Sequence, residues 1–301
     1  MTPPACAERR ALPRRRVAIT GAGALSPGGV GIEAYRRWLP GSAGERIPGF
    51  NPAEYVRSPK LLRSMHRTFQ LVAAASVLAM RAAGLPGAEQ LGPAGITPER
   101  AGIAAALADM TPLTSDLLQV LAATGPGAAG QPISWSQFAD LGLHKLHPFR
   151  RLTLLANMAA AHTSLLFGLQ GPSFTFTSGG AAGAQTLAQA YWTITHDRAD
   201  LMLCQTADSP EQSFSAHPAA ELAGAVVLEH WESAQRRGVP VIAELVADAP
   251  GEMLPAAVAA SPAVSLMHAL LAIETPHAQP LRLSAWLASE GGTPQRRGGA
   301  A

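Results

Sequence analysis

Short apolar runs alternate with longer segments of helical periodicity along the chain, and this alternation predicts a layered α/β fold. The clearest helix follows Ser58 and Pro59, an N-cap with proline at the first helical position, and its apolar face recurs at helical spacing until Gly84 ends it. A second helix, built of small residues, runs from about Gly180 to His196. The other predicted elements are a helix over Glu229–Arg237 and the strands Val17–Thr20, Ala101–Ala106, Ser173–Ser178, Leu201–Cys204, Ala225–Leu228 and Val241–Val246.

The two ends of the chain differ from this alternating core. Residues 1–16 carry five arginines, and residues 290–301 are polar with several glycines, so both are predicted to be disordered tails, the first of them basic. Between the tails we expect one domain over residues 17–248 and a reduced C-terminal piece over residues 249–289. That piece holds one predicted helix and one predicted strand, Ser265–Ile273 and Pro280–Leu287.

Composition supports a globular protein and excludes some classes of partner. Of the 301 residues, 48% are hydrophobic and 15% are charged, which suits a packed core and argues against disorder. A net charge of +2 gives no general electrostatic reason to bind nucleic acid or an anionic membrane. The most apolar stretch, Leu154–Leu169, is interrupted by polar residues, and the N-terminus lacks an apolar core of signal-peptide length. We therefore expect a soluble, cytoplasmic protein without a membrane span.

Cysteine usage gives no indication of a disulfide framework or a metal centre. The two cysteines, Cys6 and Cys204, are too few for either a set of disulfides or a four-cysteine metal site, so we expect no bound metal. Cys204 ends an apolar strand and is expected to be a buried structural thiol, as free cysteines usually are.

The glycine-rich stretch Thr20–Gly29 follows a predicted strand, where a dinucleotide-binding turn of the type G-x-G-x-x-G would lie. Its third glycine is replaced by Ser26, and Pro27 removes a backbone donor from the region that would hold pyrophosphate. None of the tyrosines has a lysine four residues later, as a short-chain reductase would need. A tight strand-to-helix turn is favoured instead, and no cofactor is expected.

Six stretches, in order, resemble motifs of the β-ketoacyl synthases, the condensing enzymes with the thiolase fold. The first is the run Gly21–Gly29, read as Gly-x-Gly-x-x-Ser-Pro-x-Gly. The resemblance implies a thiolase-like α/β half with an α-β-α arrangement over about Val17–Val246, followed by a reduced second half. The remaining stretches are Phe50–Tyr55, Met65–Leu85, Glu99–Ile103, Asn157–Ser178 and Glu221–Val246.

The same resemblance implies a dimer. In the family, the strand before the nucleophile pairs antiparallel with its equivalent across a two-fold or pseudo-two-fold axis. An edge strand with one half-buried face would suit this pairing, and an interior strand of a monomer is the alternative. The implied interface residues are Ser173, Phe174, Thr175, Phe176 and Thr177.

The residue that carries the chemistry of the family is missing. Active members place a cysteine in a Thr-Ala-Cys-Ala-x-Gly run at the start of a helix, where the thiolate is favoured. An alignment without gaps places Gly180 at this position, flanked by Ser178, Gly179 and Ala181. The two histidine motifs of the family, of His-Gly-Thr-Gly-Thr and Gly-Gly-His-Asn type, do not occur in the sequence either. The resemblance therefore implies no catalytic residue in this chain.

Members without these residues include the chain-length factors, which pair with a catalytic ketosynthase and help to shape its acyl tunnel. The chain is most similar to the short versions from aryl polyene and polyene clusters. The implied partners are a catalytic ketosynthase, in a heterodimer or heterotetramer, and indirectly an acyl carrier protein. Residues just past the strand at Ala106 approach the neighbouring acyl pocket in the family, so the candidates for a tunnel wall are Leu107, Asp109 and Met110. Filling of the chain's own core by Leu107 and Met110 is the alternative.

Other functions stay open at this point. A scaffold could recruit an acidic carrier protein through the arginines of the tail, Arg9, Arg10 and Arg14–Arg16. A homodimeric enzyme that processes acyl groups by another chemistry is a second alternative. A serine hydrolase using Ser178 is a third, with a histidine to be supplied by the fold from candidates such as His144, His147 and His162.

Overall fold

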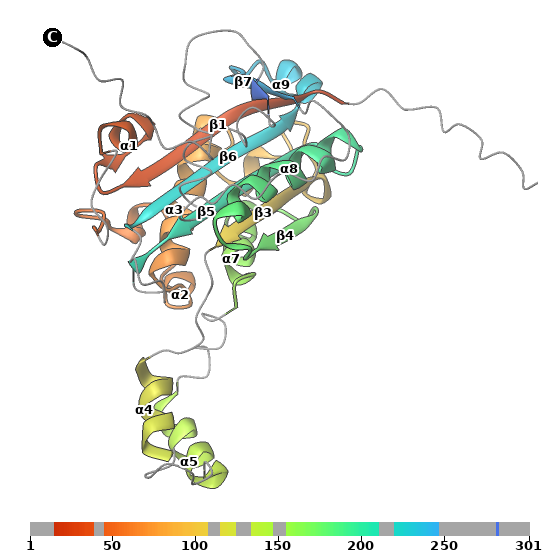
Figure 1. The fold of residues 1–301 in the computed structure, drawn as a ribbon. Coiled ribbons are helices and arrows are strands. Elements are labelled where there is room, and N and C mark those ends of the chain that lie inside the picture. The colour runs from red at the N-terminus through yellow and green to blue at the C-terminus, as the bar shows by residue number, and fades with distance from the viewer. Residues whose placement is uncertain are drawn as a thin grey trace, which may run out of the picture.

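The computed structural model describes residues 15–38, 45–107, 115–124, 134–146, 155–210, 220–246 and 281–282. These residues build one mixed β-sheet with helices on both faces (Figure 1). The sheet has eight strands in the order β4-β3-β5-β6-β1-β7-β8, with β2 paired to β1. The strands are β1 (Val17–Ser26), β2 (Gly29–Val30), β3 (Ala101–Leu107), β4 (Ser173–Phe176), β5 (Leu201–Asp208), β6 (Leu222–His230), β7 (Ala243–Val246) and β8 (Leu281–Arg282).

Strand direction reverses at three successive pairings in the centre of the sheet, from β5 to β6, from β6 to β1 and from β1 to β7. Strands β4, β3 and β5 run parallel to one another, β6 is antiparallel to both β5 and β1, and β1 is antiparallel to β7. Every residue of β3, β5 and β6 is buried, as expected for strands covered on both faces.

Two hydrophobic clusters hold the helices to the sheet, one on each face. The first cluster includes residues of α3 and α7, and the second includes residues of α8 and α1. The helices are α1 (Ile32–Trp38), α2 (Pro59–Leu62), α3 (Arg67–Ala82), α4 (Ser115–Thr124), α5 (Trp135–Lys145), α7 (Met158–Phe167), α8 (Ala182–Thr195) and α9 (Trp231–Arg237). Short 3-10 turns cover Pro52–Glu54, Ala88–Gln90, Pro98–Arg100 and Gly179–Ala181.

The glycine-rich stretch after Thr20 is part of a strand, so the tight strand-to-helix turn predicted from the sequence is wrong. β1 continues through these glycines to Ser26, and the chain reverses at Pro27 to form the short hairpin with β2. Because backbone groups of this segment pair with β6, they do not form a loop that could hold a phosphate.

The glycines of β1 are explained by the helix that crosses over them. A Cβ atom on Gly21 would lie 2.2 Å from the carbonyl oxygen of Ala79, and one on Gly23 would lie 2.3 Å from that of Ala75. Both alanines belong to α3, so these glycines allow the helix backbone to approach the strand closely.

The single helix predicted after Ser58 is two helices. Ser58 caps only α2, where its Oγ accepts a hydrogen bond from the Leu61 N–H at 3.3 Å. The extended backbone of His66, with φ −78° and ψ 175°, separates α2 from α3, which begins at Arg67. Gly84 ends α3 as predicted, with a φ of +71° that favours glycine.

Several other predicted bounds were wrong because strand pairing extends further than the apolar runs. β5 does not end at Cys204, since the strand continues between β3 and β6. Glu229 belongs to β6, so α9 begins only at Trp231. In contrast, β4 ends at Phe176, two residues before the predicted end at Ser178.

The C-terminal piece is described only in part. β8 falls within the predicted strand Pro280–Leu287 and pairs parallel with β7. The predicted helix Ser265–Ile273 and the tail 290–301 lie outside the described residues, as do residues 1–14 of the basic tail.

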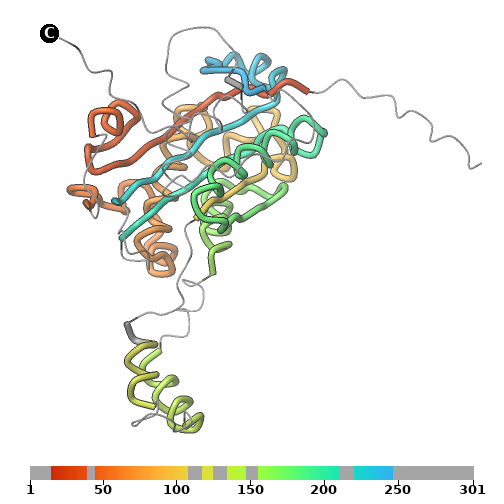
Figure 2. The backbone as a smooth tube through the Cα atoms, in the orientation of Figure 1, coloured from red at the N-terminus to blue at the C-terminus, as the bar shows by residue number. Residues whose placement is uncertain are grey.

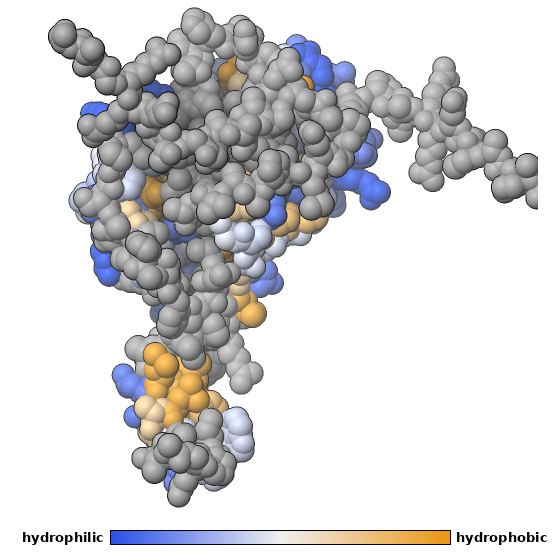
Figure 3. Space-filling model, in the orientation of Figure 1, coloured by the Kyte–Doolittle hydropathy of each residue, from blue (hydrophilic) through white to orange (hydrophobic). Residues whose placement is uncertain are grey.

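Helices α4 and α5 form a hairpin that extends away from the sheet and its helices (Figures 1 and 2). Ser134 caps α5, and the Trp135 ring meets the Phe138 ring edge-on with centroids 6.0 Å apart. Hydrophobic residues lie on the surface of this hairpin (Figure 3), where Trp135 is 71% and Leu143 is 82% exposed. Neither helix was predicted from the sequence.

Among the described residues, no helix has the length and apolar character needed to cross a membrane.

Candidate functional site

Strand β4 lies at one edge of the sheet, the place expected for the interface strand that the family resemblance implies. β3 pairs with one side of β4 in parallel register from Ser173 to Phe176, and no described strand pairs with the other side. Its side chains are half-buried or exposed, whereas those of β3 are fully buried. Unpaired edge strands offer a row of backbone donors and acceptors to another chain.

Gly180 lies directly after this edge strand, at the amino end of α8. The 3-10 turn Gly179–Ala181 leads into α8, whose first residue is Ala182. The amino end of a helix favours negative charge, so a cysteine at this position would be activated as a thiolate. Gly180 has no side chain, and the flanking Ser178 hydroxyl donates a hydrogen bond to the side-chain oxygen of Gln185.

The histidines of the described residues do not complete a serine triad at Ser178. His162 is buried on α7, and its Nε2 lies 3.1 Å from the Oγ of Ser64. The Ser64 hydroxyl donates to the carbonyl of Leu61 at 2.7 Å, so it accepts its bond from His162 and is not activated as a nucleophile. His144 lies on α5, and His147 lies outside the described residues. No local signal in the sequence pointed to the contact between Ser64 and His162.

Cys204 is a structural thiol, as the sequence predicted. It is fully buried on β5, level with Ala104 of β3 and Val226 of β6. Its Sγ donates to the carbonyl of Thr186, 3.7 Å away, and burial raises the pKa of the thiol well above its usual range. A thiol held in this protonated form is a poor nucleophile.

The candidates for a tunnel wall are only partly described. Leu107, the last residue of β3, is fully buried in the hydrophobic cluster on the α3 side of the sheet, so it fills the chain's own core. Asp109 and Met110 lie outside the described residues.

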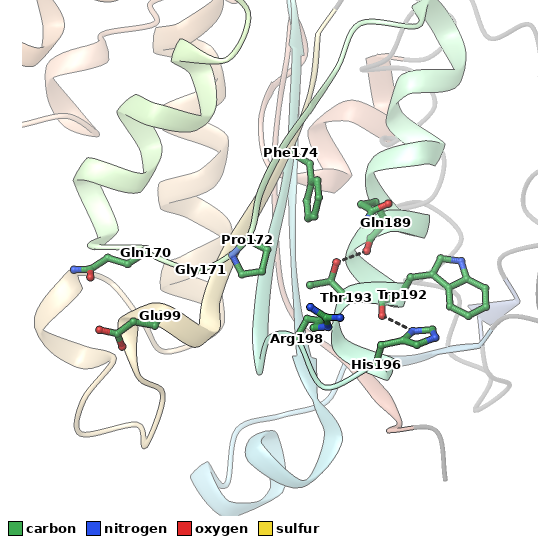
Figure 4. Close-up of a pocket in the computed structure, with 10 residues that line it drawn as sticks. All are labelled: Glu99, Gln170, Gly171, Pro172, Phe174, Gln189, Trp192, Thr193, His196 and Arg198. Carbon is green, nitrogen blue, oxygen red and sulfur yellow. Dashed lines mark hydrogen bonds between the residues drawn. The ribbon is translucent and has the colours of Figure 1, made fainter. Parts of the chain in front are cut away.

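A recess opens beside the amino end of β4, next to the carboxyl end of α8 (Figure 4). Its volume is about 610 Å³. Phe174 is one of its lining residues, and in the figure its ring points towards the α8 side, where Gln189 and Thr193 lie. The other lining residues are Glu99, Gln170, Gly171, Pro172, Trp192, His196 and Arg198. This recess was not predicted from the sequence, because its walls come from three separate segments.

Arg15 and Arg16, which the sequence assigned to the basic tail, directly precede β1 and form ion pairs with acidic residues of other segments. Arg15 forms ion pairs with Asp197 and Asp200, at 2.6 and 2.8 Å, and Arg16 pairs with Glu244 at 2.6 Å. Burial alone would raise the pKa of Asp200, but hydrogen bonds from Arg100 and Arg15 lower it overall. Arg15 and Arg16 are therefore engaged within the fold.

The described residues contain no cluster of three or more histidine, cysteine, aspartate or glutamate side chains arranged to hold a metal ion.

A family model described as "Beta-ketoacyl synthase, N-terminal domain" matches residues 40–226. Nodulation protein E of Rhizobium leguminosarum bv. trifolii is 29% identical over 274 residues, which covers 77% of this chain and 62% of that protein. The 3-oxoacyl-[acyl-carrier-protein] synthase 2 of Vibrio harveyi is 26% identical over 283 residues, with the same coverage of 77% and 62%. The chain thus spans less than two thirds of the length of these relatives.

Solved structures show the same fold at low sequence identity. A type II polyketide ketosynthase bound to the hexaketide, in complex with its acyl-carrier protein, superposes with a TM-score of 0.61 at 21% identity, covering 77% of this chain and 67% of that one. The ishigamide ketosynthase/chain length factor gives a TM-score of 0.56 at 23% identity, covering 77% and 62%. The predicted thiolase-like α/β fold is confirmed by these likenesses.

Proposed function

Because this chain belongs to the family of the β-ketoacyl synthase N-terminal domain, we propose that it is a non-catalytic subunit that pairs with a catalytic ketosynthase and helps to shape its acyl tunnel. In this proposal it acts like a chain-length factor in the elongation of a polyketide, polyene or fatty acid chain, in the cytoplasm. The ketosynthase supplies the cysteine and the histidines, and an acyl carrier protein delivers substrate to the ketosynthase.

Gly180 is the observation that carries the proposal. In the family, a cysteine at the start of this helix attacks the thioester carbonyl and holds the acyl chain. Gly180 lies at the amino end of α8, directly after the edge strand, but it has no side chain to form an acyl-enzyme. Cys204 does not replace it, because its thiol is buried on β5 and donates to a backbone carbonyl.

The edge strand supports the pairing part of the proposal. Residues Ser173–Phe176 are half-buried or exposed and have no described strand on their outer side, so a ketosynthase is proposed to add its own edge strand there. One of the solved structures with this fold is a ketosynthase/chain length factor, which is the kind of pair that we propose. Met110 is retained as the proposed tunnel-wall residue, whereas Leu107 lies in the core.

Co-expression with a full-length ketosynthase from the same genome tests the proposal. We expect the two chains to co-purify and the complex, but not this chain alone, to form the acyl-enzyme and elongate a malonyl-type substrate. Gly180→Ala should leave the rate of the complex within about twofold, whereas replacing the ketosynthase cysteine by alanine should abolish it.

The product distribution tests the tunnel role separately. If Met110 forms part of the tunnel wall, Met110→Trp should shorten the products and Met110→Ala should lengthen them. Identical distributions for both variants would exclude the tunnel role of Met110. An acyl group attached covalently to this chain alone would overturn the proposal as a whole.

A further inference from the structure

The recess beside the start of β4 carries opposite charges on its two sides. Glu99 and Gln170 lie on one side of it, and Arg198 and His196 lie on the other side, towards the end of α8 (Figure 4). Its volume of about 610 Å³ is within the range of sites that bind small molecules. The recess therefore has the size of a small-molecule site, with an acid and a base among the residues that line it.

These two charged side chains are not used within the fold. Arg198 and Glu99 are both exposed, and no hydrogen bond or ion pair of either side chain is found within the described residues. The acids nearest to Arg198 along the chain, Asp197 and Asp200, are already paired with other arginines. Arg198 thus keeps a guanidinium whose paired N–H donors match the two oxygens of a carboxylate.

Apolar side chains lie between the two charged sides. Phe174 is half-buried, and its ring points towards the α8 side of the recess, while Pro172 lies between Glu99 and Arg198 in the same view (Figure 4). Aromatic rings pack well against other flat apolar groups, either offset and stacked or edge to face. A molecule that reaches Arg198 with a charged end can therefore place a flat apolar body on Phe174 and Pro172.

We propose that this recess binds a small monocarboxylic acid with a flat apolar body, which places its carboxylate on Arg198 and its body on Phe174 and Pro172. Arg198 carries the only permanent positive charge among the ten residues that Figure 4 labels, so it determines where the carboxylate binds. The Glu99 carboxylate on the opposite side repels a second negative charge, so a dicarboxylic acid of the same shape is rejected.

This binding site goes beyond the proposed function, because it requires neither a ketosynthase nor an acyl tunnel. Phe174 belongs to β4, the strand along which a ketosynthase is proposed to pair. An acid in the recess therefore covers the start of that edge, and the acid and the ketosynthase exclude each other there. Binding of the acid to this chain alone and co-purification with a ketosynthase are separate measurements, so either can fail without the other.

Titration calorimetry of the purified full chain tests the role of Arg198. The probe is 3-phenylpropionate, and 3-phenylpropionamide is the comparison because it has the same shape without the charge. We expect the acid to bind about tenfold or more tightly than the amide, and Arg198→Gln to remove this preference. The matched control, Arg236→Gln on the exposed side of α9, should behave as wild type.

Two further variants test the opposite side and the position of the site. Glu99→Gln should bind 3-(4-carboxyphenyl)propionate about tenfold or more tightly than the wild type does, because the repulsion of its second carboxylate is removed. Gln189 lines the same recess and is half-buried, so Gln189→Trp should fill the space and abolish binding of the acid. Absence of binding to the wild type, equal affinity for acid and amide, a preference that survives Arg198→Gln, or unchanged binding in Gln189→Trp or of the diacid to Glu99→Gln would each overturn the inference.

Discussion

Gly21 and Gly23 are needed because α3 leaves no room for a side chain on the inner side of β1. A methyl group on Gly21 would overlap the carbonyl of Ala79, so we expect Gly21→Ala to lower the free energy of unfolding by about 1–3 kcal/mol or more. Gly92→Ala is the matched control, because a Cβ there meets nothing within 4 Å. Urea unfolding followed by circular dichroism measures both variants, and equal losses would contradict this account of β1.

Two histidines pack against Phe69 of α3: the half-buried His66, which precedes the helix, and the buried His162 on α7. The His66 ring lies 3.7 Å from the Phe69 ring, and neither His66 nitrogen has a hydrogen-bond partner among the described residues. Burial, together with the nearby His162, lowers the pKa of His66 to about 3. Burial also lowers the pKa of His162. Both histidines are therefore neutral in the folded chain at neutral pH.

This pair makes the fold sensitive to acid. Below about pH 6.5 the unfolded chain binds a proton on His66 that the folded chain excludes until about pH 3. The contribution of neutral His66 to the free energy of unfolding is therefore fully present above about pH 6.5. It falls as the pH decreases below that value, by up to about 1.4 kcal/mol per pH unit. His66→Phe should reduce this slope, measured as urea unfolding at several pH values between about 7.5 and 5. An unchanged slope in the variant would show that His66 titrates equally in both states.

At the scale of elements, a buried ion pair joins α9 to the sheet. Arg237 of α9 bonds to both carboxylate oxygens of Glu229 on β6, each at 3.0 Å, and to the carbonyl of Ala83 at 2.8 Å. Ser233 and Thr20 donate further hydrogen bonds to the same carboxylate. The pair thus ties β1, β6, α9 and the end of α3 together.

Removing the arginine would leave the Glu229 charge buried without its cation. We expect Arg237→Ala to lower the free energy of unfolding by about 3–5 kcal/mol. Arg36→Ala, which breaks the exposed pair with Glu33 on α1, should cost less than about 1 kcal/mol. Chemical unfolding of the two variants side by side distinguishes the buried pair from the exposed one, and similar losses would contradict this difference.

Elements with a strong local pattern could be predicted from the sequence. Strands β3 and β7 and helix α8 lie within a few residues of their predicted positions. β1 was misread because Gly21 and Gly23 signal a turn locally, and only their contact with α3, more than fifty residues away, makes them strand residues. α2 and α3 were merged because the apolar spacing continues across the extended His66.

For the candidate site, the sequence predicts the order of the elements along the chain but not which distant segments meet in space. The order of strand, Gly180 and helix follows from the sequence, and the structure places Gly180 at the amino end of α8. The recess was not predictable, because it joins Glu99, the segment Gln170–Phe174 and the end of α8. The contact between His162 and Ser64 could not be predicted for the same reason, since it joins residues 98 positions apart.

At the scale of the whole molecule, the described residues of the α4–α5 hairpin pack mainly against each other and not against the sheet. The main contacts of each helix are with the other, and Leu118, Trp135 and Leu143 are exposed on it. Replacing residues 115–146 with a short glycine-serine linker should therefore shift the Tm of the remaining chain by less than about 4 °C. Differential scanning calorimetry measures the shift, and loss of the cooperative transition would show that the hairpin supports the sheet.

In the sheet, β1 pairs with β6, a strand that is synthesised about 200 residues later. Val17 of β1 lies opposite His230 of β6, and among the described strands β1 otherwise pairs only with the short β2 and with β7, which follows β6. At about 5–20 residues per second, a ribosome takes on the order of ten to forty seconds to reach β6. During that time β1, an apolar segment, has no long strand to pair with. Production of this protein in a cell therefore depends on how well the nascent chain is kept from aggregating before residue 230 leaves the ribosome.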